Sequence, residues 1–461
     1  MHKSPIVCFL ILLFASSFAF AQTGTETPYS RYGIGELYYN GFARQTAMGG
    51  LGAAYQSTSA VNFSNPASYS HLRITTFETA LRGELACASS SGVSQTKKGM
   101  LLNYLSLGFP VIKDLWGASF GLIPVSSSGY NLKDAGTTFN PNDTITSSFT
   151  RLYSGKGGLS RFYIGNGVAP FTKSLDKFYD SQRYEDLRSA GDSAAIHRAV
   201  RTRSFFKGLA VGFNASYLFG TLVNERKVVF DDPSFMNIRN TDNTSYNDFY
   251  FDYGFTWAFD LKNDYSITIG ASGAGGTNIR GRRDVLQTLI ASNSIESNID
   301  TVYMVENEKG KIFMPSNLSA GIVLQQSEKW LIGAEFNFQQ WSRYKSFNED
   351  QNLSDSWRIS AGGQYMPTPK LLYRAGLRYE RTNINLRNTP VNDFAVSLGA
   401  GVPIRLTSTE RRTLDNRTML HFTLEAGQMG TTTNNLVRQQ YVRLYVGITA
   451  NELWFIKRKY D

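Results

Sequence analysis

The sequence predicts an all-β protein: a fourteen-stranded antiparallel transmembrane β-barrel with an N-terminal hatch, or plug, and a small periplasmic helical insert. Three observations predict this fold. An export signal begins the chain, many short segments alternate apolar with small or polar residues, and the Gly-, Ala- and Ser-rich residues 48–72 have neither helical nor strand periodicity. Together these features favour a multi-pass barrel in the cell outer membrane of a Gram-negative-type envelope.

The first 21 residues have the pattern of a signal peptide. Lys3 gives a positive start, residues 6–14 are apolar, and Ala19-Phe20-Ala21 forms an A-x-A cleavage site. The apolar run is too short to span a membrane as a helix. Cleavage leaves Cys87 as the single cysteine, so no internal disulfide can form.

Composition and charge are consistent with an exported membrane protein. The mean hydropathy of −0.26 excludes a bundle of apolar helices, whereas 13% aromatic residues and 41 glycines are typical of membrane barrels. The net charge of +10 becomes +9 when Lys3 is removed, and it is spread over loops and strand ends. We therefore expect contact with anionic outer-membrane lipid rather than with nucleic acid.

Alternation along the chain defines the strands. In residues 208–220 the apolar side chains from Leu209 to Phe219 face one way, and Gly, Ala, Asn and Ser face the other. Residues 249–260 repeat this pattern with an aromatic row. The predicted strands are residues 74–86, 100–110, 115–126, 157–168, 205–230, 246–261, 264–273, 312–325, 329–342, 356–366, 370–381, 391–403, 418–428 and 438–450.

The expected organisation is a hatch at residues 22–72 followed by a barrel at residues 73–461. Two segments interrupt the strands. Residues 170–203 stand where a short periplasmic turn is due, and within them residues 174–201 have apolar residues at helical spacing. Residues 274–311 form the longest predicted external loop, in which DVLQTLIA at residues 284–291 fits a short amphipathic helix.

The hatch is expected to fill the lumen. Asn65-Pro66-Ala67 forms a turn, because proline fixes φ and biases the preceding residue away from helix. Small hatch residues would let its backbone approach the inward-facing glycines of the wall closely. These glycines are Gly212, Gly362, Gly376 and Gly399.

With these segments placed, the sequence resembles the FadL family of outer-membrane transporters for long-chain fatty acids and other hydrophobic compounds. Met48-Gly49-Gly50 and Asn65-Pro66-Ala67 are similar to that family's small-residue hatch and its NPA motif. The other matching motifs lie at residues 111–119, 315–317, 341–344, 355–358 and 373–376. The resemblance implies passive transport through an external groove and a plugged lumen, with a lateral exit at a kink in the third strand.

Two of the implied site segments have a second interpretation. In the third strand, Pro124 removes a ladder donor and Gly129 permits unusual dihedrals, which suits a lateral gate or an ordinary strand end beside a Ser-rich loop. In the long loop, Leu286, Leu289 and Ile290 could form a ligand-catching groove or only pack the loop.

Three arginines are candidates for binding a fatty-acid carboxylate. Alternation places Arg358, Arg374 and Arg378 toward the lumen, and a guanidinium can hold a carboxylate through two hydrogen bonds. The alternative is that they pair with Glu335, Glu380, Glu425 and hatch carbonyls, and thereby hold the hatch.

Enzymatic activity and cofactor binding are not expected. Outside the signal, only His71, His197 and His421 are present, without catalytic or metal-ligand spacing, and the MGGLGAA stretch does not follow a strand in a βαβ unit. The alternative to transport is a structural barrel subunit of an outer-membrane secretion or assembly complex. In that case residues 174–201 would dock a periplasmic or lipoprotein partner.

Overall fold

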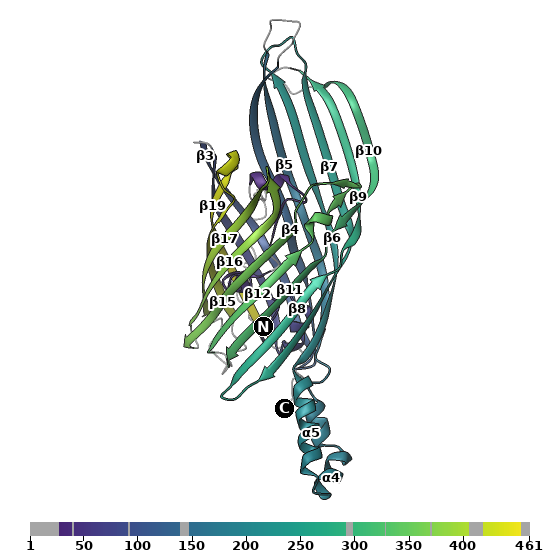
Figure 1. Cartoon of the computed structure of the whole chain (residues 1–461), viewed down its shortest axis with the longest axis vertical. Helices are drawn as coiled ribbons and strands as arrows, with labels where there is room; N and C mark the ends of the chain where they lie inside the picture. Colours follow the sequence, from purple (N-terminus) through teal and green to yellow (C-terminus); the bar gives the residue numbers. More distant parts are fainter. Residues whose placement is uncertain are drawn as a thin grey trace, which may run out of the picture.

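We describe a computed structural model of the chain, covering residues 27–38, 41–90, 93–138, 147–291, 298–327, 329–368, 371–404 and 418–452. The predicted signal peptide and the C-terminal residues 453–461 lie outside this description. Fourteen antiparallel strands of the described residues close into a barrel, in which β19 pairs with β2 (Figure 1). They are β2 (Thr75–Ser90), β3 (Val93–Ile112), β4 (Trp116–Thr138), β5 (Ser147–Val168), β6 (Leu209–Phe230), β7 (Asn237–Asp260), β8 (Tyr265–Ala274), β11 (Asn317–Gln326), β12 (Trp330–Gln339), β15 (Ser356–Thr368), β16 (Leu371–Leu386), β17 (Thr389–Ile404), β18 (Thr418–Met429) and β19 (Arg438–Glu452).

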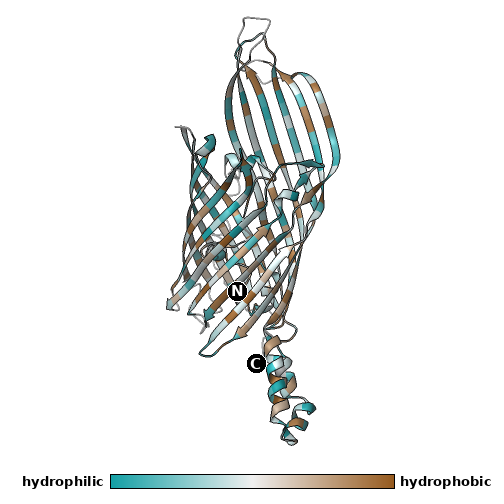
Figure 2. Ribbon diagram, viewed as in Figure 1, coloured by the Kyte–Doolittle hydropathy of each residue, from teal (hydrophilic) through white to brown (hydrophobic). Residues whose placement is uncertain are grey.

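The alternation of side chains has the predicted consequence for the wall. Val211 and Phe213 of β6 are about half exposed on the outside, whereas Ala210 and Asn214, which flank them, are buried. Phe249 and Phe251 of β7 are exposed in the same way, on either side of buried Tyr250. Figure 2 shows hydrophobic and hydrophilic residues alternating along the strands. The outside of the barrel is therefore an apolar surface suited to lipid, and inward-facing residues of β6 such as Ala210 and Asn214 are small or polar.

The upper part of the barrel is taller on one side than the sequence predicts. β9 (Thr277–Ile290) pairs with β7 and β10 (Asn298–Met314) pairs with β9, so that β4 to β7, β9 and β10 rise as one curved sheet above the rest (Figure 1). We call this sheet the upper wall. The predicted helix at residues 284–291 is wrong, and most of the predicted 274–311 loop is strand. The spacing of apolar residues in a segment as short as 284–291 fits a helix and a strand alike. The strand forms because β7 and β10 lie on either side of β9 and pair with it.

The insert between β5 and β6 is helical, as predicted. It consists of α3 (Ser174–Tyr179), α4 (Gln182–Ser189) and α5 (Ser193–Lys207), which project from the end of the barrel that has the short turns (Figure 1). The breaks between the helices coincide with Ser181, which caps α4, and with Gly191, whose φ is +68°. In the described part of the chain, no helix is long and apolar enough to cross a membrane.

The N-terminal segment lies inside the barrel. It contains η1 (Pro28–Arg31), the two-residue strand β1 (Glu36–Leu37), α2 (Ala43–Thr46) and η2 (Pro66–His71). Residues 41–72 are mostly buried, and we call them the plug. Short elements complete the loops on the opposite side from the insert: η3 (Trp341–Arg343), β13 (Lys345–Ser346), β14 (Glu349–Asp350) and η5 (Thr433–Asn435).

Candidate functional site

The plug contacts the wall where the wall has no side chains. A Cβ built on Gly376 would lie 2.0 Å from the backbone nitrogen of Gly49, and one on Gly212 would lie 2.2 Å from the carbonyl carbon of Pro66. The corresponding atoms on Gly362 and Gly399 would meet Met48 and Ala47. All four glycines expected to admit the plug are therefore in contact with it. Larger residues at these positions would occupy the space of the plug backbone.

Polar groups of the wall and the plug join across this interface. Asn65 donates from Nδ2 to the carbonyl oxygens of Phe255 at 3.0 Å and Ala271 at 3.3 Å, while its Oδ1 accepts from the N–H of Ala67 at 3.1 Å. Pro66 and Ala67 are buried beside it. The turn at residues 65–67 is thus fixed both to itself and to two barrel strands.

Glu335 of β12 provides a second anchor from the wall. Its Oε2 accepts hydrogen bonds from the backbone N–H groups of Gly52 and Ala53, at 2.7 Å each. Arg358 lies 3.7 Å from the other carboxylate oxygen. A carboxylate that accepts two backbone N–H groups in a buried site is strongly bound, because leaving those donors unpaired would cost free energy.

Strands β3 and β4 are unpaired above the level of the plug, and we call this unpaired boundary the seam. Their pairing ends at Leu105 and Leu122, although both strands continue upward. Immediately beyond, β4 has a register shift between Pro124 and Ser126 in its pairing with β5. Proline has no N–H to donate, so the ladder cannot continue regularly through this position. β4 continues through Gly129 to Thr138, so the alternative of a strand end beside a Ser-rich loop is wrong, and the gate stays a prediction.

The seam borders a cavity of about 510 Å³, and the N-terminal segment covers it from inside. Tyr38, Leu101, Leu122, Pro124 and Gly129 are among the residues that line the cavity. Strand β1 pairs with β4 at the same height, with Glu36 opposite Ser127 and Leu37 opposite Ser126. The residues of β1 therefore stand between the lumen and the seam.

An ion pair holds β1 in this position. The Glu36 carboxylate lies 2.6 Å from a guanidinium nitrogen of Arg443 on β19, and 3.8 Å from Arg82 on β2. Arg443 also pairs with Glu84 and Glu425, so Glu36 belongs to a buried network of the wall. The sequence interpretation omitted Glu36, Arg82 and Glu84. Alternation along β2 could have placed Arg82 and Glu84 in the lumen, but no local signal identifies the partner of Glu36.

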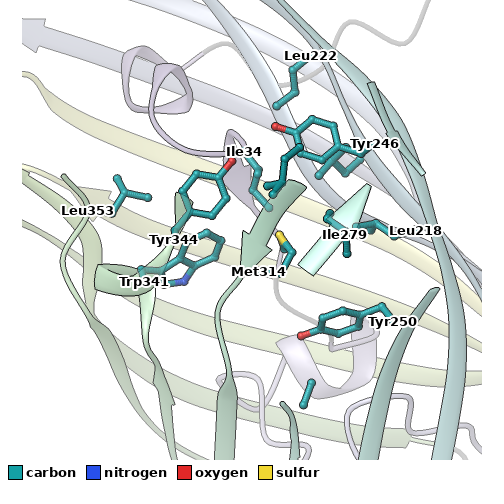
Figure 3. Packing of buried hydrophobic residues seen from close by; sticks show 13 residues of the cluster. Ile34, Leu218, Leu222, Tyr246, Tyr250, Ile279, Met314, Trp341, Tyr344 and Leu353 are labelled. Atoms are coloured by element: carbon teal, nitrogen blue, oxygen red, sulfur yellow. The ribbon is translucent and has the colours of Figure 1, made fainter. Parts of the chain in front are cut away.

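The lumen above the plug is apolar. Side chains from β6, β7 and β9 and from the Trp341–Tyr344 region converge around Ile34 of the N-terminal segment (Figure 3). A small cavity of about 80 Å³ lies between Ile34, Leu37, Tyr250 and Trp341. These side chains are buried against one another, so they form a packed apolar layer above the plug.

The three predicted arginines have different surroundings. Arg378 is buried and contacts Asp393 at 3.0 Å and Glu425 at 3.2 Å, so its charge is compensated by the wall. Arg358 faces Glu335. Arg374 contacts Gln364 at 3.0 Å and His421 at 3.2 Å, and none of the described carboxylates lies within ion-pair distance of it. Arg358 and Arg378 therefore form ion pairs within the wall, as the second interpretation expects, whereas Arg374 forms none with the described residues.

Leu286, Leu289 and Ile290 lie in β9 of the upper wall rather than in a loop. Ile290 is buried, while Leu286 and Leu289 are half-buried and pair across the ladder with Met304 and Asp300 of β10. None of the three lines the cavities at the seam or above the plug. Their assignment as a ligand groove stays a prediction.

The fold and the plugged lumen define a class of structure: a plugged fourteen-stranded β-barrel with the FadL-type fold. A solved structure of a FadL homologue from Pseudomonas aeruginosa is similar, with a TM-score of 0.56 and 10% identity over 90% of this chain and 99% of that one. The toluene transporters TbuX of Ralstonia pickettii and TodX of P. putida each give a TM-score of 0.50, at 14% and 15% identity. Both matches cover 90% of this chain, together with 99% of the TbuX chain and 100% of the TodX chain.

At these identities the likeness shows the fold. A family model described as BamG matches residues 1–176 and 191–461, and the chain belongs to the BamG family. The unmatched residues 177–190 fall within α3 and α4 of the insert. No protein of curated function matches the chain.

Proposed function

We propose that the protein is a passive transporter of long-chain fatty acids or other hydrophobic compounds across the outer membrane. The observation that carries this proposal is the seam between β3 and β4, with its cavity of about 510 Å³ on one side and the apolar lumen on the other. In the proposed path, the compound enters the apolar lumen, passes the β1 segment and leaves sideways into lipid through the seam at Pro124–Gly129.

Physical chemistry favours a sideways exit for such a compound. The plug closes the lumen below with buried, hydrogen-bonded groups, which an apolar molecule would have to leave unsatisfied in order to pass. At the seam it would cross only a two-residue strand and reach hydrocarbon directly. No ATP, metal, cofactor or catalytic step is needed, because the transfer of apolar surface into lipid is itself favourable.

A reversible lock at the seam tests the path. Leu37 and Ser126 are directly opposite in the β1–β4 ladder, a spacing that a disulfide can bridge. Leu37→Cys with Ser126→Cys, in a Cys87→Ser background, should block uptake of labelled oleate by cells when oxidised and restore it on reduction. Each single cysteine variant is the matched control. Uptake by the fully oxidised double variant at the wild-type rate would refute the lateral path.

A second function, a structural subunit of an envelope complex, is favoured by the helical insert. α3 to α5 occupy a position where a short turn would suffice, and ordering unneeded residues costs conformational entropy. The insert covers part of its apolar surface, since Phe178 is buried against Tyr184 and Arg203, whereas Tyr179 and Phe205 are exposed. Its exposed surface, with Arg183, Arg198 and Arg201, suits an acidic periplasmic or lipoprotein partner.

Replacement of the insert tests this second function. A short Gly-Asn turn in place of residues 171–202 should leave barrel folding and oleate uptake unchanged, and should abolish co-purification of a partner with the native protein. The control is a charge-preserving variant, Arg198→Lys with Arg201→Lys, which should retain the partner. If the native protein purifies alone from its own envelope and the shortened form misfolds, the insert is part of the barrel floor.

A further inference from the structure

A pocket at the periplasmic end of the barrel, distant from the seam, contains an unusual concentration of positive charge. It has a volume of about 230 Å³ and lies between plug residues 55–59 and the wall strands β12, β15, β16 and β18. A space of roughly 10–15 Å³ on this measure suffices for one water molecule, so the pocket can hold a much larger group. Leu331, Leu372 and Met419, which line it, are within two residues of the periplasmic strand ends.

Two buried guanidinium groups face this pocket. Arg44 of the plug and Arg374 of β16 are both among its lining residues, with only 9% and 4% of their surfaces exposed. One buried carboxylate is nearby, Glu78, at 3.7 Å from Arg44. None of the described residues that line the pocket carries a carboxylate. The two arginines therefore share a single counter-charge, although buried charges are ordinarily paired.

The hydrogen-bond donors of Arg44 are poorly satisfied. Its Nε has no partner, and its contacts with the hydroxyl groups of Tyr55 and Ser57 are 3.4 and 3.5 Å long. Those with His421 and Thr449 are 3.3 and 3.4 Å. Charge-assisted hydrogen bonds from arginine are normally about 2.7–2.9 Å long, so none of these contacts is a strong one.

His421 cannot serve as an acceptor for both arginines. Its Nδ1 lies 3.2 Å from Arg374, and its Nε2 lies 3.3 Å from Arg44 and 3.1 Å from the Thr449 hydroxyl. The Thr449 hydroxyl donates to Glu78 at 2.8 Å, so it accepts from Nε2, which must then carry the proton. Because Nε2 is a donor in that tautomer, the contact with Arg44 is donor against donor. His421 therefore supplies no acceptor to Arg44, whose acceptors among the described residues are the long hydroxyl contacts given above.

We propose that this pocket binds an oxyanion, a carboxylate or a phosphate, between Arg44 and Arg374. Such a group supplies the missing negative charge and accepts from the unsatisfied guanidinium donors, with the hydroxyl-rich residues 57–59 beside it. The oxyanion can be the head group of an amphiphile, whose chain would lie along Leu331, Leu372 and Met419, or free inorganic phosphate. The site is independent of the lateral path, because β3 and β4 contribute no residue to it.

Calorimetric titration of the full-length protein in a neutral detergent tests the proposal. The probes are inorganic phosphate, decyl phosphate and decanoate, with uncharged decanol for comparison. Arg374→Gln and Arg44→Gln should each weaken oxyanion binding by roughly 10- to 100-fold. Hydrogen bonds to a charged group contribute about 1.5–3 kcal/mol, and each ~1.4 kcal/mol corresponds to about a tenfold change in affinity. Arg358→Gln is the matched control, because its guanidinium already faces Glu335.

The relative affinities of the probes distinguish the two sources of the oxyanion. Equal affinity for phosphate and decyl phosphate indicates a phosphate site, and tighter binding of decyl phosphate or decanoate indicates a head-group site. The proposal fails if no oxyanion binds, if Arg44→Gln and Arg374→Gln bind like the wild type, or if decanol binds as tightly as decanoate. Should the variants not fold, thermal unfolding of the wild type replaces them: at constant ionic strength, added oxyanion must raise the midpoint, and an unchanged midpoint refutes the site.

Discussion

Glu335 tests whether specific polar anchors, rather than packing alone, keep the plug in the barrel. Its carboxylate accepts the N–H groups of Gly52 and Ala53, both at 2.7 Å. Hydrogen bonds to a charged group contribute about 1.5–3 kcal/mol each. Glu335→Ala therefore removes roughly 3–6 kcal/mol of plug attachment, which corresponds to a 10²- to 10⁴-fold larger population of displaced plug. Glu335→Gln retains an acceptor oxygen but loses the charge, and should lie between the two.

Single-channel recording in planar bilayers measures this effect. The wild type is expected to be closed, Glu335→Gln to open rarely, and Glu335→Ala to show frequent openings. Glu349→Gln is the control, because this carboxylate is exposed in β14 and does not belong to the plug or to its wall contacts described above. A closed Glu335→Ala channel with wild-type heat stability would refute the anchor. Free conduction by the wild type would refute the plug itself.

Three further predictions concern the plug and the upper wall. Deletion of residues 46–70 should turn the closed barrel into a conducting one in planar bilayers, and a deletion variant that stays closed would contradict this prediction. Gly376→Val should displace the plug and destabilise the protein by about 1–3 kcal/mol through overpacking, measured by urea unfolding, whereas Gly83→Val, where a Cβ meets its nearest atom at 4.0 Å, should be tolerated. Leu286→Thr with Leu289→Thr, chosen to preserve strand propensity, should weaken oleate binding about tenfold; unchanged binding would exclude these residues from the ligand path.

The sequence predicts the lower barrel well because each strand there carries its own signal. One face of β6 or β7 meets lipid and the other meets the plug, so apolar and small residues must alternate. The same reasoning fails for the upper wall. Residues 239–245 near the start of β7 are polar on both faces, and they show no alternation. The strand is identified there only by its pairing with β6 and β9.

For the site residues as well, the sequence predicts some properties and not others. Alternation places Arg358, Arg374 and Arg378 in the lumen, but it cannot say which of them is compensated. The carboxylates beside Arg378 come from β17 and β18. That Arg374 has no carboxylate at ion-pair distance among the described residues is visible only in three dimensions. Glu36 and Arg443 are 407 positions apart in the sequence. Long-range pairs of this kind depend on closure of the barrel, which no local pattern encodes.

The two parts of the N-terminal segment are attached to the barrel by different means, and this difference bears on how a closed barrel can release a ligand. Residues 47–67 are enclosed by wall glycines and held by Glu335 and Asn65, so that moving them would break many contacts at once. Strand β1 is held by two ladder positions and by the Glu36–Arg443 pair. Short, sparsely paired segments open at lower free energy than packed ones. Release of β1 alone would uncover the seam while the plug stays in place, so lateral exit and a closed axial pore are compatible in one structure.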